Sequence, residues 1–199
     1  MSHSLSKQVV VVSGAGRGLG AAIAAAFARE GAQVVVNYRA SRAQAEALAA
    51  TLGPRTVALQ ADVRDASQVG AMFDTIERTM GPVTTVVHNA LADYRFNGDA
   101  RDTIATLTPD KLLEQTNTAC VGALTLLQRA VPAMAQAGFG RVVTIGSNLV
   151  QNPVVPYHDY TAAKSALLAF TRTAAAELGP RGITVNMVSG GLLRTCLLY

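Results

Sequence analysis

The sequence predicts a doubly wound α/β/α fold, in which helices cover both faces of a parallel sheet. Short apolar runs rich in β-branched residues alternate along the chain with stretches rich in Ala, Leu, Glu and Arg. The apolar runs are nearly continuous, which is typical of strands buried on both faces of a parallel sheet. Glycines follow the helical stretches, where a left-handed cap favours them. Such an alternation implies βαβ units with right-handed crossovers.

The elements follow one another in strict alternation. Residues 9–12 are four valines in a row, and Gly14 ends the run. Further runs of the same kind predict strands at 34–36, 56–59, 83–87, 141–145 and 183–188. The stretches between them predict helices at 19–29, 42–52, 67–80, 109–136 and 157–178. Glycines near the expected helix ends, each a candidate left-handed cap, stand at Gly31, Gly53, Gly81, Gly138 and Gly179.

Length and composition favour one domain. A chain of 199 residues that is 50% hydrophobic can bury roughly 70% of its unfolded surface around a single core. No uninterrupted apolar run approaches the roughly 20 residues of a membrane span, and no signal-peptide pattern comes first. We therefore expect a cytoplasmic chain.

Cysteine and charge patterns exclude other classes of protein. Cys120 and Cys196 have neither metal-ligand nor redox spacing, so we expect reduced thiols and no metal site. The net charge of +4 is scattered rather than gathered in a stripe, which argues against nucleic-acid binding. A mild positive field suits an anionic small molecule, and a solvated surface explains it equally well.

The stretch 93–102 is long and polar for a connection that follows a strand. Ligands of open parallel sheets bind beyond the carboxyl ends of the strands. This stretch is therefore either the rim of a substrate site or an ordinary surface loop.

A glycine-rich turn joins the first strand to the first helix. It reads Ser13-Gly14-Ala15-Gly16-Arg17-Gly18-Leu19-Gly20. Closely spaced glycines let the backbone approach a pyrophosphate, and the helix N-terminus offers it free N–H groups and a positive dipole end. In this context the turn predicts a dinucleotide site.

The end of the second strand indicates which dinucleotide. An acidic residue there would bind the ribose 2′-hydroxyl of NAD, but the stretch reads Asn37-Tyr38-Arg39. Without a carboxylate, Arg39 and Arg17 are free to pair with a 2′-phosphate, so we expect NADP(H).

Three residues suggest a proton donor. Tyr160 and Lys164 stand four apart in an expected helix and share one face. A neighbouring ammonium favours the phenolate and so lowers the pKa of tyrosine from about 10. Ser147, at the end of a strand, could contribute a hydroxyl to the same substrate atom. Each residue alone has an ordinary structural explanation.

With these motifs in order, the sequence resembles the short-chain dehydrogenase/reductase family, and within it the 3-oxoacyl-acyl-carrier-protein reductases and related ketoreductases. The resemblance covers essentially the whole chain and implies a Rossmann fold. The matching motifs are Ser13-Gly14-x-x-x-Gly18-x-Gly20, Asp62-Val63, Asn89-Ala90, Asn117, and Ser147 with Tyr160-x-x-x-Lys164.

The resemblance implies hydride transfer between a nicotinamide and a carbonyl or alcohol carbon. Tyr160 would be the acid, Ser147 would hold the carbonyl oxygen, and Lys164 would lower the Tyr160 pKa and bind the nicotinamide ribose. Asn117 would support a water chain that resupplies the proton. Asp62 and Val63 would contact the adenine. Tyr157 has no lysine four residues on, so with His158 it is expected at the pocket mouth.

The chain also departs from the family pattern. Asn-Asn-Ala-Gly appears as His88-Asn89-Ala90-Leu91, which puts a large side chain near the cofactor. The Pro-Gly pair after the sixth strand appears as Ser189-Gly190, and we still expect Gly190 and the stretch 191–195 to meet the nicotinamide amide.

Family members usually continue past residue 199 through a substrate-covering loop, a helix and a final strand. We therefore expect 1–199 to form one catalytic domain without those elements, with an exposed edge at the sixth strand. The resemblance further implies a homodimer or homotetramer built through the helices that begin near 109 and 157.

Two functions are weighed. The first is an NADPH-dependent ketoreductase acting on a 3-oxoacyl thioester, carried on acyl carrier protein or CoA as in fatty acid biosynthesis, or on a similar carbonyl. The second is a dinucleotide-binding module with little or no catalysis, because the lid is missing. A purely structural or nucleic-acid-binding role would leave the glycine turn and the Tyr160–Lys164 pair unexplained.

Overall fold

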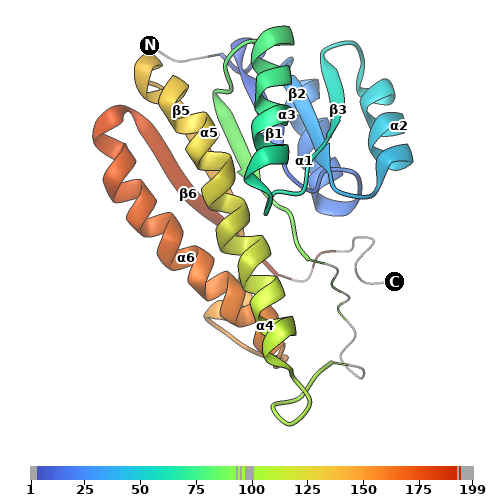
Figure 1. Cartoon of the computed structure of the whole chain (residues 1–199), viewed down its shortest axis with the longest axis vertical. Helices are drawn as coiled ribbons and strands as arrows, with labels where there is room; N and C mark the ends of the chain where they lie inside the picture. Colours follow the sequence, from blue (N-terminus) through green and yellow to red (C-terminus); the bar gives the residue numbers. More distant parts are fainter. Residues whose placement is uncertain (1–3, 93, 95, 97–100, 192, 194–199) are drawn as a thin grey trace.

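The computed structural model describes residues 4–92, 94, 96, 101–191 and 193. These residues form a six-stranded sheet in the order β3-β2-β1-β4-β5-β6, and every neighbouring pair is parallel (Figure 1). The strands are β1 Val9–Val12, β2 Gln33–Tyr38, β3 Thr56–Gln60, β4 Thr85–His88, β5 Gly140–Ser147 and β6 Ile183–Gly190. The predicted doubly wound α/β/α fold is confirmed. The strand order reverses between β1 and β4, which opens a crevice at their carboxyl ends.

The helices fill the connections between the strands. They are α1 Gly18–Arg29, α2 Arg42–Leu52, α3 Ala66–Thr79, α4 Pro109–Thr116, α5 Gly122–Ala137 and α6 His158–Leu178. The helix predicted at 109–136 contains a π-helical turn, η2 Asn117–Val121, which links α4 to α5 in one long rod that lies beside α6 (Figure 1). Such turns occur often at functional sites.

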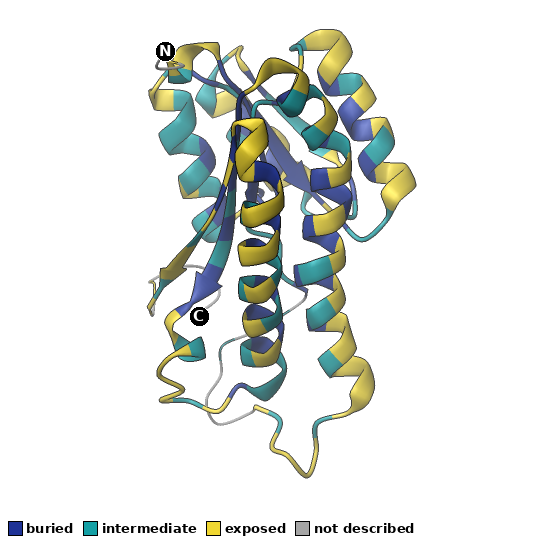
Figure 2. Cartoon of the chain, turned by 90° about the vertical axis from the view of Figure 1, so that its left-hand side faces the viewer, coloured by how far each residue is buried: buried dark blue, intermediate teal, exposed yellow. Residues whose placement is uncertain are grey.

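Alternate residues of the strands build two separate apolar layers. Val9 and Val11 of β1 pack with side chains of α3, α5 and α6 on one face of the sheet. Val10 and Val12 pack with α1 and α2 on the other. The sheet between these layers is buried along β1, β2 and β4 (Figure 2). This two-sided burial explains the continuous apolar runs in the sequence.

One of the predicted glycine caps is wrong. Gly138 ends α5 in the left-handed region with a φ of 62°. Gly179, however, has a φ of −52° and continues into a short 3₁₀ turn, Gly179–Arg181. The left-handed residue is Gly182, with a φ of 77°. Pro180 is accommodated because it stands in the first turn of that 3₁₀ segment, where its missing N–H costs nothing.

The last strand is less covered than the first. Side chains alternate between buried and exposed in the first half of β6, and Val188 is 57% exposed. Within the part of the chain that the structure describes, β6 pairs only with β5. The edge predicted from the sequence is therefore present among the described residues.

The rod 109–137 is the one described helix with the length and composition of a membrane span. It has 29 residues, and its most apolar window has a mean hydropathy of 1.2. Half of that window is buried within the fold, as in core helices that meet the same criterion. Polar residues are spread along this helix, so it reaches its length without an uninterrupted apolar run.

Candidate active site

Two cavities lie at the carboxyl ends of the strands. The first, of about 360 Å³, is lined by the turn after β1, by residues 38–41 at the end of β2 and by residues 89–92 after β4, and we name it the glycine groove. The second, of about 410 Å³, contains Ser147, Tyr160 and Lys164, and we name it the tyrosine cavity. Leu19, Asn89 and Leu91 line both. The two cavities therefore adjoin at the point where the strand order reverses.

The glycine turn packs backbone against backbone. Gly14 has a φ of 62°, and a Cβ there would lie 2.9 Å from the Cα of Ala90. A Cβ on Gly20 would lie 2.5 Å from the carbonyl oxygen of Gly14. The Ser13 hydroxyl accepts hydrogen bonds from the N–H groups of Asn89 and Ala90, both at 3.0 Å. The turn thus requires small residues and is tied to the end of β4.

The glycine groove fits a dinucleotide. Helix α1 begins at Gly18 on the groove wall, and no side chain in the described chain caps its first N–H groups, which leaves them free for an anion. Arg17 and Arg39 line the groove, and no carboxylate is among its described lining residues. A pyrophosphate at the helix N-terminus and a further phosphate near the arginines match this donor set.

Most of the predicted cofactor residues line the glycine groove. They are Gly14, Arg17, Gly18, Leu19, Gly20, Tyr38, Arg39 and Asn89. Gly190 lines the tyrosine cavity instead. Ser13 and Ala90 lie behind the groove in the hydrogen bonds that hold the turn.

Asn37 does not face the groove, although the sequence placed it there. Its side chain is buried, and its Nδ2 donates to the carbonyl oxygens of Leu59 and Ala61 at 3.4 and 3.1 Å. Successive residues of a strand point to opposite faces, so Tyr38 faces the groove and Asn37 cannot. Asn37 therefore ties β2 to β3.

Asp62 and Val63 also lie outside both cavity linings. Both carboxylate oxygens of Asp62 accept from Arg64, at 2.6–3.2 Å, and these hydrogen bonds lower the pKa of Asp62. Val63 is buried, and its carbonyl oxygen accepts from the Thr125 hydroxyl. The adenine contact predicted for this pair stays a prediction.

Beyond the glycine turn and the motif at 88–91, the sequence reasoning missed four residues of the groove. They are Ala40, Ser41, Gln44 and Ala92. Ser41 stands at the N-cap position of α2, and a serine before a helix is a recognisable sequence signal. Because this second helix also begins at the groove, residues at its start could have been included.

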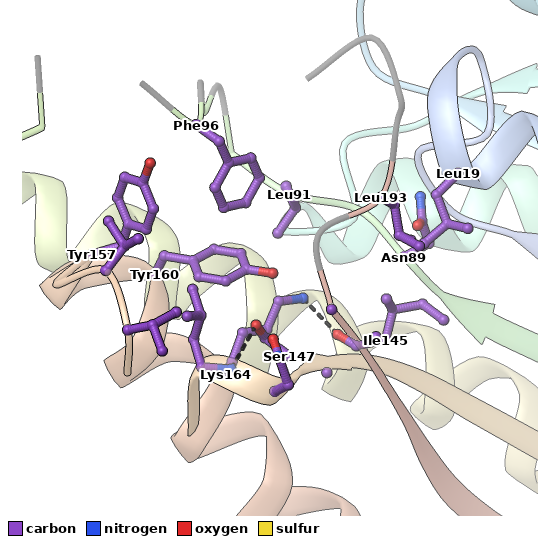
Figure 3. Close-up of a pocket in the computed structure, with 17 residues that line it drawn as sticks. Leu19, Asn89, Leu91, Phe96, Ile145, Ser147, Tyr157, Tyr160, Lys164 and Leu193 are labelled. Carbon is purple, nitrogen blue, oxygen red and sulfur yellow. Dashed lines mark hydrogen bonds between the residues drawn. The ribbon is translucent and has the colours of Figure 1, made fainter. Parts of the chain in front are cut away.

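The structure brings Ser147, Tyr160 and Lys164 together (Figure 3). Ser147 ends β5, while Tyr160 and Lys164 are one turn apart in α6. The Leu149 N–H donates to the Ser147 oxygen at 3.2 Å, so the Ser147 hydrogen remains available to the neighbouring Tyr160 oxygen. The two hydroxyl groups thus share one point of the cavity.

The pKa of Tyr160 differs from the sequence-based expectation. Burial raises the pKa of Tyr160, and the hydrogen bond from Ser147 offsets only part of this rise. The Lys164 ammonium donates to the carbonyl oxygen of Ile145 at 2.6 Å and lies 5.6 Å from the Tyr160 ring centre. Burial lowers the pKa of Lys164 to about 8. The expected lowering of the Tyr160 pKa by Lys164 is therefore not found, and Tyr160 is protonated at neutral pH.

Asn117 is not part of the tyrosine cavity lining. It is the first residue of η2, and its side chain is exposed. The neighbouring residues Thr118 and Ala119 are buried instead. Position in the sequence motif could not reveal this, because the motif does not show which side of the rod is buried.

A buried histidine links the glycine turn to this π-helical turn. The His88 Nε2 lies 3.0 Å from the carbonyl oxygen of Ala119, which can only accept, so this nitrogen carries the hydrogen. The other nitrogen, Nδ1, then accepts from the Ser13 hydroxyl at 3.2 Å. Burial, and secondarily the charge of Lys164, lowers the pKa of His88 to about 4. His88 is thus a neutral ring behind the wall that the two cavities share.

Aromatic and aliphatic side chains form the rest of the tyrosine cavity. Phe96 and Leu91 stand across from the Tyr160 hydroxyl, and Tyr157 lies on the far side of the Tyr160 ring (Figure 3). Tyr94 packs behind Phe96 and donates to Asp159 at 3.2 Å. The predicted rim 93–102 therefore contributes at Phe96. Residues 93, 95 and 97–100 of that stretch, and 192 and 194–199 including Cys196, lie outside the described residues.

Comparisons with known proteins agree with this geometry. The family described as enoyl-(acyl carrier protein) reductase matches residues 14–198. A short-chain type dehydrogenase/reductase of Picea abies is 34% identical over 205 residues, which cover 98% of this chain and 74% of the relative. NADPH-dependent aldehyde reductase 2 of Arabidopsis thaliana is 33% identical, over 98% of this chain and 75% of its own. A 3-oxoacyl-[acyl-carrier-protein] reductase of Staphylococcus aureus is 33% identical, over 92% and 73%.

Proposed function

The chain belongs to the short-chain dehydrogenase/reductase family of nicotinamide-dependent oxidoreductases, and we propose that it reduces a 3-oxoacyl thioester or a similar carbonyl compound with NADPH. One observation carries the proposal. Ser147, Tyr160 and Lys164 meet in a cavity that adjoins a groove fitted to a dinucleotide. A carbonyl oxygen at the Ser147–Tyr160 pair would lie beside that junction.

In the proposed reaction the two hydroxyl groups act on one oxygen. NADPH, when bound, supplies a hydride to the carbonyl carbon and becomes NADP⁺. The carbon–oxygen π bond breaks, and Tyr160 gives its phenolic proton to the oxygen, which completes the alcohol. Ser147 donates a hydrogen bond to the same oxygen as negative charge develops there. The high pKa of Tyr160 suits this role, because the donor must hold its proton beforehand.

Lys164 would stabilise the phenolate that Tyr160 becomes. Its ammonium group is buried one helical turn away and is held by the Ile145 carbonyl oxygen. Tyr160 then recovers a proton from solvent. We propose that Asn117 acts in that recovery only at the solvent end, because its side chain is exposed.

The preference for NADPH rests on Arg17 and Arg39. Both guanidinium groups line the glycine groove, where a 2′-phosphate can accept their hydrogen bonds. The relative from Arabidopsis thaliana whose name states NADPH dependence supports this choice. Leu19, Asn89 and Leu91 would meet the cofactor where it passes into the tyrosine cavity, and Gly190 would lie at its nicotinamide end.

The proposed enzyme is a homodimer or homotetramer. Leu113, Val121 and Leu124 are exposed along the rod 109–137, and exposed small residues, Ala162 and Ala169, lie on α6 beside it. Apolar and small residues together on two neighbouring helices favour close packing against another copy. Size-exclusion chromatography with light scattering tests the assembly, and a monomer would contradict it.

The activity is tested by mixing the protein with NADPH and an acetoacetyl thioester and following the nicotinamide absorbance. We expect the absorbance to fall and the hydroxyacyl product to appear. Tight NADPH binding by a folded sample that oxidises none of it would instead support a dinucleotide-binding module without catalysis.

A further inference from the structure

Aromatic residues are concentrated around the tyrosine cavity. The chain has five tyrosines, five phenylalanines and no tryptophan. Four of these ten rings, those of Tyr94, Phe96, Tyr157 and Tyr160, contact one another there. Two come from the connection after β4 and two from the start of α6. Segments far apart in sequence thus converge to build one aromatic wall.

Phe96 contacts the other three rings of this wall and also lines the cavity, which Tyr94 does not. Its ring centre lies 5.0 Å from that of Tyr160 and 5.5 Å from that of Tyr157, with interplanar angles of 85° and 88°. Both are edge-to-face contacts of the kind that aromatic rings prefer. Phe96 and Tyr157 also line the cavity itself (Figure 3). A planar ring that enters the cavity can extend the same packing.

Six of the described lining residues of the cavity have polar side chains: Asn89, Ser147, Asn148, Tyr157, Tyr160 and Lys164. The hydrogen-bonding groups of Ser147 and Tyr160 lie at the reacting end. Among the described lining residues Lys164 is the single charged side chain, and its ammonium is already held by Ile145. Aliphatic side chains, among them Leu149, Val154 and Val155, make up much of the remaining described lining.

This distribution discriminates between carbonyl compounds. A carboxylate or phosphate next to the reacting carbonyl would lose water, and the single described cation of the lining, Lys164, already donates to Ile145, so burial of that charge is costly. An apolar group loses nothing comparable and gains burial. An aromatic group gains edge-to-face contacts in addition.

We propose that the tyrosine cavity selects uncharged ketones or aldehydes that carry an aromatic ring, with Phe96 as the specificity-determining residue. The inference rests on the proposed reductase function and narrows it to a substrate class. The substrate oxygen lies at Ser147 and Tyr160, and its ring packs on Phe96 and Tyr157.

Two pairs of probes test the two parts of the proposal, with NADPH and the wild-type protein. Benzylacetone and its cyclohexyl analogue have the same reach and differ in whether the ring is aromatic. Methyl levulinate and levulinate differ in whether the chain ends in a charge. We expect kcat/KM to be about 2- to 10-fold higher for benzylacetone than for the cyclohexyl ketone. For methyl levulinate we expect an advantage on the order of 100-fold over levulinate.

Variants assign the aromatic preference to Phe96. Phe96→Leu keeps an apolar side chain and removes the ring, so the preference for benzylacetone should fall to near one, with the affinity for NADPH unchanged. Phe27→Leu is the matched control, because Phe27 packs with the layer of α1 and α2 and lines neither cavity. That variant should keep the wild-type preference.

The outcomes separate this inference from the function on which it rests. If acetoacetyl thioester is reduced but neither benzylacetone nor methyl levulinate is, the reductase function stands and the inference fails. Equal rates within either pair, or an unchanged preference in Phe96→Leu, also overturn it. If no carbonyl compound oxidises NADPH, the proposed function itself fails.

Discussion

The glycine groove and the tyrosine cavity have similar volumes, about 360 and 410 Å³, but they are built differently. The groove is formed by three short stretches, 14–20, 38–44 and 89–92, each at the carboxyl end of one of three neighbouring strands. The cavity is formed by side chains that come from β5, the connection after it, α6 and the connection after β4, while Gly190 of β6 contributes backbone. A binding site made of consecutive residues can be read from a sequence, whereas one made of converging side chains depends on the fold.

The largest expected effect separates chemistry from cofactor binding. In Tyr160→Phe the proton donor is lost while the ring remains, so kcat should fall by about 10²- to 10⁴-fold. The affinity for NADPH should stay the same, because the groove is untouched. Steady-state kinetics with an acetoacetyl thioester measure kcat, and a fluorescence titration measures the affinity for NADPH.

The matched control for that variant is Tyr157→Phe. Tyr157 lines the same cavity but has no lysine four residues on, so its hydroxyl should be dispensable. Near-full activity of Tyr160→Phe would exclude Tyr160 as the acid, and a comparable loss in Tyr157→Phe would remove the distinction between the two tyrosines.

A second effect concerns how His88, behind the wall that the two cavities share, makes stability depend on pH. Burial lowers the pKa of His88 from 6.5 to about 4, so between these values the unfolded chain holds a proton that the folded chain does not. The stabilising contribution of the neutral ring is complete above pH 6.5 and is lost as the pH falls toward about 4. The free energy of unfolding should drop by roughly 3 kcal/mol over this range.

Urea unfolding of the wild type and of His88→Asn across this pH range isolates that contribution. The variant cannot take up this proton, so its stability should depend less steeply on pH, whatever its stability at neutral pH. Parallel curves for the two proteins would show that His88 does not titrate in the way the burial of its ring requires.

A third effect tests which cofactor the groove prefers. Arg39→Ala removes a charged donor from the groove, so the ratio of NADPH to NADH affinities should fall by about 10- to 100-fold. The tyrosine cavity is not altered, and kcat at saturating NADPH should be retained. Arg29→Ala, at the exposed end of α1, should leave the ratio unchanged. Wild-type protein that binds NADH as tightly as NADPH would contradict the assignment.

The smallest expected effect compares two glycines with left-handed backbone. Gly53 has a φ of 96° and nothing within 4 Å of the position of a Cβ, so Gly53→Ala should cost only strain, about 1–2 kcal/mol of stability. Gly14→Ala adds a contact at 2.9 Å with the Ala90 backbone. Both variants should melt earlier, but only Gly14→Ala should lose NADPH affinity. Equal NADPH binding by the two would mean that the close approach in the turn is unimportant.

The sheet and the glycine turn could be predicted from the sequence, whereas much of the tyrosine cavity could not. The sheet could be predicted because runs such as the valines of β1 are buried on both faces, and the glycine turn because backbone geometry demands it. The position of Asn37 outside the groove lining could not be predicted, because a strand alternates its faces and the sequence does not show which face meets the groove. The electrostatics of Tyr160 depend on burial and on the direction of Lys164, and both are set by the packing of α6 on β5. The aromatic wall could not be predicted, because it depends on how the connection after β4 lies against α6.

The π-helical turn η2 affects which length changes the long rod can accommodate while its side chains keep facing the sheet. Each residue of an α-helix rotates the chain by about 100°, so one residue more or fewer turns every later side chain to another face. A π turn accommodates one additional residue without that rotation. An insertion or deletion between 122 and 125 would turn Leu126 and Met134 away from the sheet, whereas loss of one residue within 117–121 can be absorbed by a return to regular α-helix. Length changes in this rod are therefore tolerated best beside Asn117 and the carbonyl group that accepts from His88.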